Sequence, residues 1–203
     1  MKIICVGRNY IDHVNELNNK IPEEPAIFLK PESALITGEQ VFIIPDFSRE
    51  IHHEVELVLK VSRKGKNISE ADAIRYINEI TTGIDFTARD IQDKLKEKRL
   101  SWELSKAFDK AAAIGEFLPL PSVGHPDQIA FRLLINNELR QSGNSKDMIF
   151  SFEKIICFIS HYFTLEEGDL IFTGTPAGVG PVKSGDVLKA YLNNIQLLQL
   201  DIR

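Results

Sequence analysis

This sequence has only two cysteines, no long apolar run and no excess of basic residues. The two cysteines, Cys5 and Cys157, both have apolar neighbours, which predicts buried free thiols and favours a reducing cytoplasm. No apolar run reaches the roughly 18 residues that a membrane span needs, and the stretch before Arg8 is too short for a signal peptide. With 24 basic against 29 acidic residues, the net charge of -5 argues against a nucleic-acid surface.

The composition itself is that of an ordinary globular protein. Hydrophobic residues make up 43% of the 203 residues and charged residues 26%, so the chain is long enough to bury a substantial core. No repeat, low-complexity tract or flexible linker divides it. We therefore expect a single domain over residues 1–203.

Residue patterns along the chain predict more strands than helices. Strands are expected at 2–7, 26–30, 40–44, 51–61, 169–174 and 187–192, and a hairpin at 131–141 that turns at Asn136-Asn137. Helices are expected at 9–17, from Ser69 to Thr81-Thr82-Gly83, at 87–98 and at 152–162. Because strands outnumber helices and do not alternate regularly with them, the expected fold class is α+β with a strand-rich core.

Three acidic residues form the first candidate site. Glu54 and Glu56 lie two apart on the strand 51–61, so their side chains leave the same face, with Cα atoms roughly 6.5 Å apart. Carboxylates so placed gain nothing on a buried face unless a cation joins them. Asp85 supplies a third acid, and an all-oxygen set suits Mg²⁺, Mn²⁺ or Ca²⁺ better than zinc. Strand periodicity alone leaves open a second interpretation, in which the acids only solvate a half-exposed face.

An acid–base pair is the second candidate site. His13 and Glu16 are three residues apart and would share one face of a helix. Glu16 would orient His13 and raise its basicity, so that the imidazole takes a proton from water near neutral pH. The pattern is also that of an exposed His–Glu pair on a surface helix.

A stiff loop over residues 174–181 is the third feature. Its sequence, GTPAGVGP, holds three glycines and two prolines, and its backbone N–H groups are able to meet an anion. No Gly-Lys-Ser/Thr follows, so it is not a P-loop, and turns of this composition are often only turns.

Six segments of the chain together resemble the fumarylacetoacetate hydrolase family, in particular its short, single-domain acylpyruvase-like branch. They occur in the family's order and are GRNYIDHVNE at 7–16, FLKP at 28–31, HHEVEL at 52–57, GIDFTARDIQ at 83–92, SKAFD at 105–109 and GDLIFTGTPAGVGP at 168–181. The resemblance implies a core of mixed β-sheet, a homodimer and a small-molecule substrate. It makes the metal site the favoured interpretation of the three acids.

The resemblance also implies roles for the first two sites. Glu54, Glu56 and Asp85 match the family's metal-binding acids, where Mg²⁺ or Mn²⁺ is usual. His13 and Glu16 match the pair that activates water, on a lid segment at about residues 9–25.

Five further positions match residues that the family uses around its substrate. Lys106 matches the lysine near the metal and the reacting carbonyl. Arg89 and Gln92 match residues that contact the carboxylate end of the substrate. Thr175 matches the threonine of the substrate-binding loop, and Lys30 matches the lysine of the FLKP motif, which we expect at the substrate.

The implied chemistry is hydrolysis of a C–C bond in an acylpyruvate or fumarylpyruvate-type 2,4-diketo acid. The metal acts as a Lewis acid on the leaving enolate, His13 activates water, and Lys106 stabilises the oxyanion. Within the family the alternatives are decarboxylation of oxaloacetate and isomerisation or decarboxylation in aromatic catabolism. From a different class, the chain would be a non-catalytic β module that binds a metal for structure.

Overall fold

A computed structural model describes residues 1–16, 20–36 and 41–203 of the chain. The described residues form an α+β fold dominated by strands, as the sequence predicts. Of the expected segments, Leu17 at the end of the first helix, part of the lid at 9–25 and Gln40 at the start of a strand lie outside the described residues.

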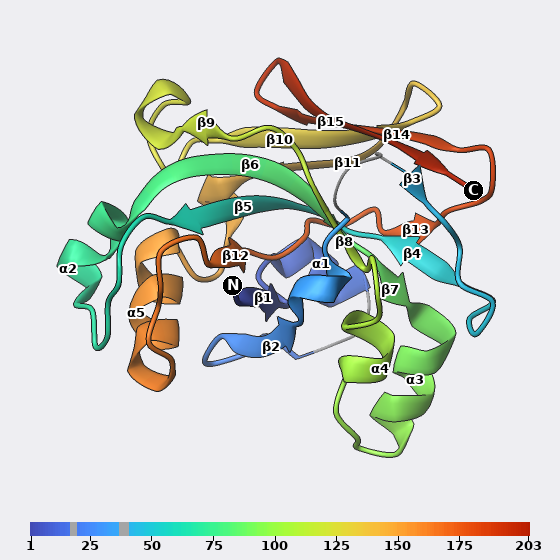
Figure 1. Cartoon of the computed structure of the whole chain (residues 1–203), viewed down its shortest axis with the longest axis horizontal. Helices are drawn as coiled ribbons and strands as arrows, with labels where there is room; N and C mark the ends of the chain where they lie inside the picture. The colour runs from blue at the N-terminus through green and yellow to red at the C-terminus, as the bar shows by residue number, and fades with distance from the viewer. Residues whose placement is uncertain (17–19, 37–40) are drawn as a thin grey trace.

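A sheet runs through the middle of the molecule (Figure 1), and Glu56 and Asp85 of the candidate metal site lie on two of its strands. Its strands run in the order β2-β1-β12-β5-β6-β8, and β9 also pairs with β6. Only β1 and β12 are parallel among these pairs, so the sheet is mixed. The strands are β1 (Ile3–Gly7), β2 (Ala26–Lys30), β5 (Val55–Val61), β6 (Ile77–Asp85), β8 (Ala112–Ile114), β9 (Leu118–Pro119) and β12 (Leu170–Phe172).

A second sheet packs against the first and closes the core. It runs in the order β11-β10-β14-β15-β3, and its members β10, β14 and β15 contact β5 and β6. The strands are β3 (Val41–Phe42), β10 (Ala130–Ile135), β11 (Glu138–Asn144), β14 (Val187–Leu192) and β15 (Ile195–Ile202). Leu57, Leu59 and Ile80 from the first sheet are buried in one cluster with Phe131 and Leu188 from the second.

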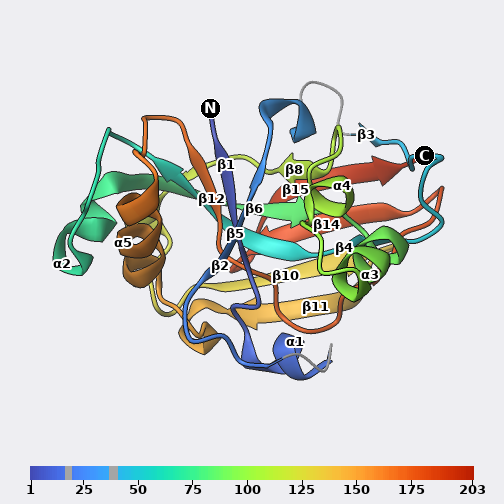
Figure 2. The ribbon, with the colours of Figure 1, turned by 90° about the horizontal axis from the view of Figure 1, so that it is seen from below.

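A small third sheet and two groups of helices surround this core. The sheet runs in the order β13-β4-β7 and joins β4 (Ile51–His53), β7 (Thr87–Ala88) and β13 (Gly180–Pro181). In Figure 1, α2 and α5 lie at one end of the molecule and α3 and α4 at the other, whereas Figure 2 shows α1 at an edge of its own. The helices are α1 (Ile11–Glu16), α2 (Glu70–Ala73), α3 (Arg89–Glu97), α4 (Glu103–Lys106) and α5 (Phe152–Tyr162), with short 3₁₀ turns at Glu32–Ala34, Ile74–Tyr76, Leu120–Ser122 and Ser145–Asp147.

The expected helix from Ser69 to Thr81-Thr82-Gly83 is wrong over most of its length. The α-helix covers only Glu70–Ala73 and continues as a 3₁₀ turn to Tyr76, and β6 begins at Ile77. The segment is rich in β-branched residues, whose side chains fit a pleated surface better than a helix. It lies between β5 on one side and β8 and β9 on the other, so pairing with both neighbours decides its conformation.

Other expected elements are confirmed. The hairpin of β10 and β11 turns at Asn136 and Asn137, both with positive φ, as a two-residue hairpin turn requires. The helix at 152–162 is α5, and Ser151 caps it by accepting from the N–H of Lys154. Within the described residues, no helix is long and apolar enough to cross a membrane.

Candidate metal centre and active site

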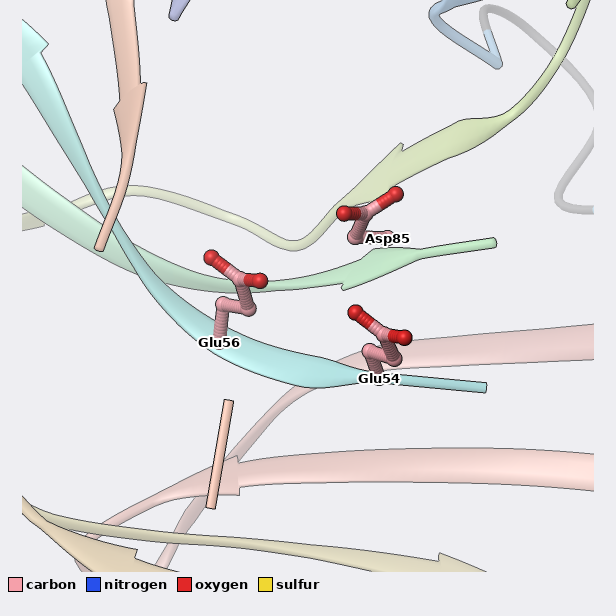
Figure 3. A group of neighbouring side chains, drawn as sticks. All are labelled: Glu54, Glu56 and Asp85. Atoms are coloured by element: carbon pink, nitrogen blue, oxygen red, sulfur yellow. The ribbon is translucent and has the colours of Figure 1, made fainter. Parts of the chain in front are cut away.

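The three acids predicted as metal ligands meet at the end of the β5–β6 pair. Antiparallel pairing sets Val55 opposite Ile84, and the N–H of Asp85 donates to the carbonyl of Glu54 at 2.8 Å. One oxygen of each carboxylate lies within 4.8 Å of the others, and the residues are between 0% and 5% exposed. Figure 3 shows Glu54 and Glu56 leaving the same face of one ribbon and Asp85 rising from the neighbouring one. They are therefore not a solvated outer face.

Three basic side chains neutralise part of this cluster. Lys106 Nζ lies 2.7 Å from Glu54 Oε2 and 2.7 Å from Asp85 Oδ2. Lys30 Nζ pairs with Asp85 Oδ1 at 2.7 Å, and Arg89 Nη2 pairs with Glu54 Oε1 at 2.5 Å. Although burial opposes the charged form of Lys106, the two carboxylates raise its pKa overall, so it remains a cation at neutral pH.

Glu54 and Glu56 differ sharply in their electrostatic surroundings. Burial would raise the pKa of Glu54, but Lys106 and Arg89 outweigh it and hold that pKa well below the usual range. Burial raises the pKa of Glu56 well above the usual range, and the charges of Asp85 and Glu54 raise it further. Its carboxylate accepts a hydrogen bond from the N–H of Gly174 at 2.7 Å. A charged Glu56 in this setting needs a further cation.

The chemistry of this donor set fits a divalent cation that prefers oxygen ligands. Three buried carboxylates with oxygens this close together repel one another, and a hard cation between them would relieve the repulsion. Glu54, Glu56 and Asp85 would supply the protein ligands for Mg²⁺ or Mn²⁺.

Lys30 has a different place from the one expected. Its side chain is 0% exposed and pairs with Asp85, and its ammonium also donates to the carbonyls of Lys106 and Ala111. Two of its N–H donors thus go to backbone carbonyls, and the ammonium forms an ion pair with Asp85. Lys30 therefore lies behind Asp85 and the segment of Lys106, and it is not among the residues that line the cleft described below.

The predicted acid–base pair forms on α1. His13 Nδ1 lies 3.2 Å from Glu16 Oε2, and Glu16 Oε1 accepts from the N–H of Gly178 at 3.0 Å. His13 is only 5% exposed, and burial lowers the pKa of its imidazole even though Glu54 and Glu16 act in the opposite direction. Glu16 raises the pKa of His13, as expected, but desolvation is the larger effect and the pKa is lowered overall. The imidazole is neutral at neutral pH and able to accept a proton.

The predicted substrate contacts lie beside the metal site. Arg89 and Gln92 are buried on the first turns of α3, where Arg89 Nη1 donates to Gln92 Oε1 at 2.5 Å. Thr175 is fixed by two hydrogen bonds. Its Oγ1 donates to the carbonyl of Val55 at 2.8 Å and accepts from Gln141 Nε2 at 2.9 Å.

Three polar residues that hold the site were not predicted. Thr87 donates to Glu54 Oε1 at 3.0 Å. Gln141 also accepts from the N–H of Val55 at 3.0 Å and donates to the carbonyl of Pro176. Asn9 binds both the N–H and the carbonyl of Phe150. Gln141 lies on a hairpin strand whose neighbours are largely exposed, so its sequence pattern is that of a surface residue.

One cleft collects most of these side chains. It is lined by residues from β1, β2, β5, β6, α1, α3 and α4 and from the loop after β12, which are Val6, Gly7, Arg8, His13, Phe28, Glu54, Glu56, Asp85, Arg89, Gln92, Lys96, Trp102, Lys106 and Thr175. Glu16 contacts His13, and Lys30 lies behind Asp85. The cleft therefore places a candidate metal site, a neutral imidazole and a cationic wall side by side.

Comparison with known proteins identifies the family. The family model described as fumarylacetoacetate (FAA) hydrolase C-terminal matches residues 2–203. The chain therefore belongs to the fumarylacetoacetate hydrolase family of enzymes, as the six segments predict.

Relatives with different names match this chain over most of their own length. The chain is 40% identical to the mitochondrial oxaloacetate tautomerase of Bos taurus over 98% of its own length and 90% of the relative's. It is 42% identical to the mitochondrial oxaloacetate decarboxylase of Dictyostelium discoideum, covering 99% of this chain and 93% of that one. The crystal structure of fumarylpyruvate hydrolase from Pseudomonas aeruginosa in complex with Mn²⁺ and pyruvate superimposes with a TM-score of 0.93 at 33% identity, covering 100% of this chain and 89% of that one.

Proposed function

We propose that this protein is a divalent-metal-dependent enzyme that interconverts the keto and enol forms of oxaloacetate. The observation that carries the proposal is the neutral, buried imidazole of His13 in one cleft with three buried carboxylates. Relatives of nearly equal length that are 40–42% identical are named for oxaloacetate, which supports this substrate over the acylpyruvate expected from the sequence.

The chain's own residues account for the proton transfers. Glu54, Glu56 and Asp85 would hold Mg²⁺ or Mn²⁺, which when bound supplies Lewis acidity toward the 2-oxo oxygen. Because His13 Nδ1 is occupied by Glu16, Nε2 is the atom that exchanges a proton with substrate. Nε2 removes a proton from C3 of the keto acid, and the same proton is returned to oxygen to give the enol.

The cationic side chains orient the substrate. Arg89 and Gln92 would bind the carboxylate next to the 2-oxo group, since their polar ends face the cleft beside Glu54. Lys106 remains charged and stabilises negative charge that develops on the substrate oxygen.

Hydrolysis of an acylpyruvate or fumarylpyruvate-type compound is a second candidate function. The His13–Glu16 pair favours it, because the same Nε2 would remove a proton from a water that attacks the C4 carbonyl. A solved relative that superimposes over the whole chain is named a fumarylpyruvate hydrolase.

A small substrate panel tests the proposal. The purified protein is assayed with oxaloacetate, by loss of the enol absorbance, and with acetylpyruvate and fumarylpyruvate, by pyruvate release, each with Mg²⁺, Mn²⁺ or EDTA. We expect metal-dependent acceleration of the oxaloacetate tautomerisation and its loss in EDTA. Full activity in EDTA, or no turnover of any of the three, would overturn the proposal.

A pair of histidine variants separates chemistry from binding. His13→Ala should lower turnover by about 10²–10⁴-fold, because it removes the proton-transferring group, and should leave Mn²⁺ binding intact. His125→Ala is the matched control, since His125 is exposed and outside the cleft. If His13→Ala turns over oxaloacetate like the wild type, the proton-transfer role is excluded.

A further inference from the structure

The cleft contains two cations that the proposed reaction does not use. Arg8 follows β1 and Lys96 lies near the end of α3, and both line the cleft together with Trp102. They are separate from Lys30, Lys106 and Arg89, which are paired with the acids of the metal site.

Arg8 is held over the cleft by its backbone and by an aromatic wall. Its φ is 61°, in the left-handed region that residues other than glycine seldom adopt and that is enriched at functional sites. Its guanidinium carbon lies 5.6 Å from the centre of the Trp102 ring, and that ring packs edge-on against Phe28. Gly7 leaves the room for this ring, because a Cβ at that position would lie 3.2 Å from Trp102. The cation is thus preorganised.

Lys96 is a partly buried cation whose positive charge is only weakly balanced by an acidic side chain. Its side chain is 30% exposed, and its ion pair with Asp93 is long, at 3.8 Å. Burial lowers the pKa of Lys96, and the positive charges of Arg89 and Arg8 lower it further. Lys96 is therefore close enough to both arginines to be repelled by them. In the part of the chain that the structure describes, no carboxylate lies within ion-pair distance of Arg8.

The balance of charges inside the cleft indicates that its ligand is an anion. The three acids of the metal site face three basic groups, Lys30, Lys106 and Arg89. Arg8 and Lys96 add two positive charges, of which only that of Lys96 has an acid of the described chain within ion-pair distance, the long contact with Asp93. Clustered cations of this kind concentrate anions, and Arg recognises a carboxylate through paired N–H donors.

We infer that Arg8 and Lys96, with Trp102 as an apolar wall, form a second anion subsite that selects 2-oxo acids with a distal carboxylate. This inference rests on the proposed function and names its substrate class as dicarboxylates. The carboxylate beside the 2-oxo group would bind at Arg89 and Gln92, next to the metal site, and the far carboxylate would bind at Arg8 and Lys96. Monocarboxylates of the same length leave the second subsite empty.

Binding of two matched, unreactive 2-oxo acids tests the subsite apart from turnover. 2-Oxoglutarate and 2-oxopentanoate have the same chain length and differ in the distal carboxylate. Calorimetry with the Mg²⁺-loaded wild type should show at least about tenfold tighter binding of the dicarboxylate. In the double variant Arg8→Gln, Lys96→Gln this preference should disappear, whereas the control Lys94→Gln, Lys98→Gln, an equal loss of charge at exposed positions of the same segment, should retain it.

Kinetics supply the second measurement. For oxaloacetate and fumarylpyruvate the double variant should lower kcat/KM by about tenfold or more, chiefly through KM, and for acetylpyruvate by less than about threefold. Arg8→Lys, which keeps the charge, should recover part of the loss. Equal losses for all substrates, or a binding preference that survives in the double variant, would overturn the subsite.

The two proposals fail in different ways. If the wild type turns over oxaloacetate but binds the two 2-oxo acids equally, the anion subsite is excluded and the proposed function stands. If the wild type turns over none of the substrates but prefers the dicarboxylate in a manner that depends on Arg8 and Lys96, the proposed reaction is excluded and the subsite stands.

Discussion

At the scale of single residues, the environment of each carboxylate matters more than its identity. Glu54 receives hydrogen bonds from Lys106, Arg89 and Thr87, and its pKa is lowered. Glu56, two residues on, receives the N–H of Gly174, and its pKa is raised by burial and neighbouring acids. The ionised form of Glu56 is therefore unfavourable in the folded protein until a cation binds, which is a common compromise between stability and function.

Glu56→Gln tests this compromise. In EDTA, at a pH above the raised pKa of Glu56, the variant should be more stable than the wild type by about 0.5–2 kcal/mol, because a neutral amide replaces an unfavourable buried charge. A raised folded-state pKa means that protonation stabilises the folded wild type, so the difference should shrink as the pH falls through that pKa. Urea denaturation at several pH values measures it. A variant less stable than the wild type at every pH would contradict this account.

The sequence reveals the acids of the site but not what holds them. Glu54, Glu56 and Asp85 are recognisable because acids two apart on a strand and a third beside apolar residues match a family pattern. Gln141 and Thr87 act through contacts with distant segments, and no local pattern encodes such contacts. The position of Lys30 behind Asp85 likewise follows from sheet packing and not from its motif.

At the scale of elements, the pairing of β5 with β6 builds the metal site. The alternation in β5 is enough to predict that strand, although both of its faces prove to be buried. The residue pattern after Ser69 favours a helix as far as Gly83, but the α-helix ends at Ala73, because β6 gains strand partners on both sides. Local periodicity does not show which strands will pair with β6. Without that pairing, residue patterns alone do not predict that Asp85 lies close to Glu54.

Asn9 ties the start of the α1 segment to two other elements. It is 0% exposed, donates to the carbonyls of Thr173 and Phe150 and accepts from the N–H of Phe150. Asn9→Ala should destabilise the protein by about 2–4 kcal/mol, because it leaves buried backbone groups without partners. Urea denaturation provides the measurement, with the exposed Gln199→Ala as control, expected within about 0.5 kcal/mol of the wild type. A loss below about 1 kcal/mol would show that water replaces these bonds.

At the scale of the whole molecule, two sheets form a core that does not depend on the metal site. The main apolar cluster lies between the sheets, and the acids lie at the end of one strand pair, beside α3 and α4. The strand-rich α+β class and the family follow from the sequence. The homodimer, the cytoplasmic location and the lid at about 9–25 stay predictions; the names of the oxaloacetate relatives place those proteins in mitochondria.

Metal binding should stabilise the folded chain as a whole. At a free Mg²⁺ or Mn²⁺ concentration of about 100 times the dissociation constant, the gain is about 2.7 kcal/mol. For a chain of this size that corresponds to a rise in Tm of roughly 5–10 °C. Differential scanning calorimetry with metal and with EDTA measures it, and Asp85→Asn should abolish the shift. Identical Tm values for the wild type in both buffers would rule out the metal site.

The contact of Glu16 with both His13 and Gly178 has a pharmacological consequence. A single carboxylate on a six-residue helix contacts the His13 imidazole, which we propose transfers the proton, and the loop behind Thr175 at the same time. A small molecule that binds between α1 and this loop would break both contacts of Glu16 at once. We expect such a compound to inhibit the enzyme without chelating a metal. It would recognise a surface of this protein and not a feature shared by most metalloenzymes.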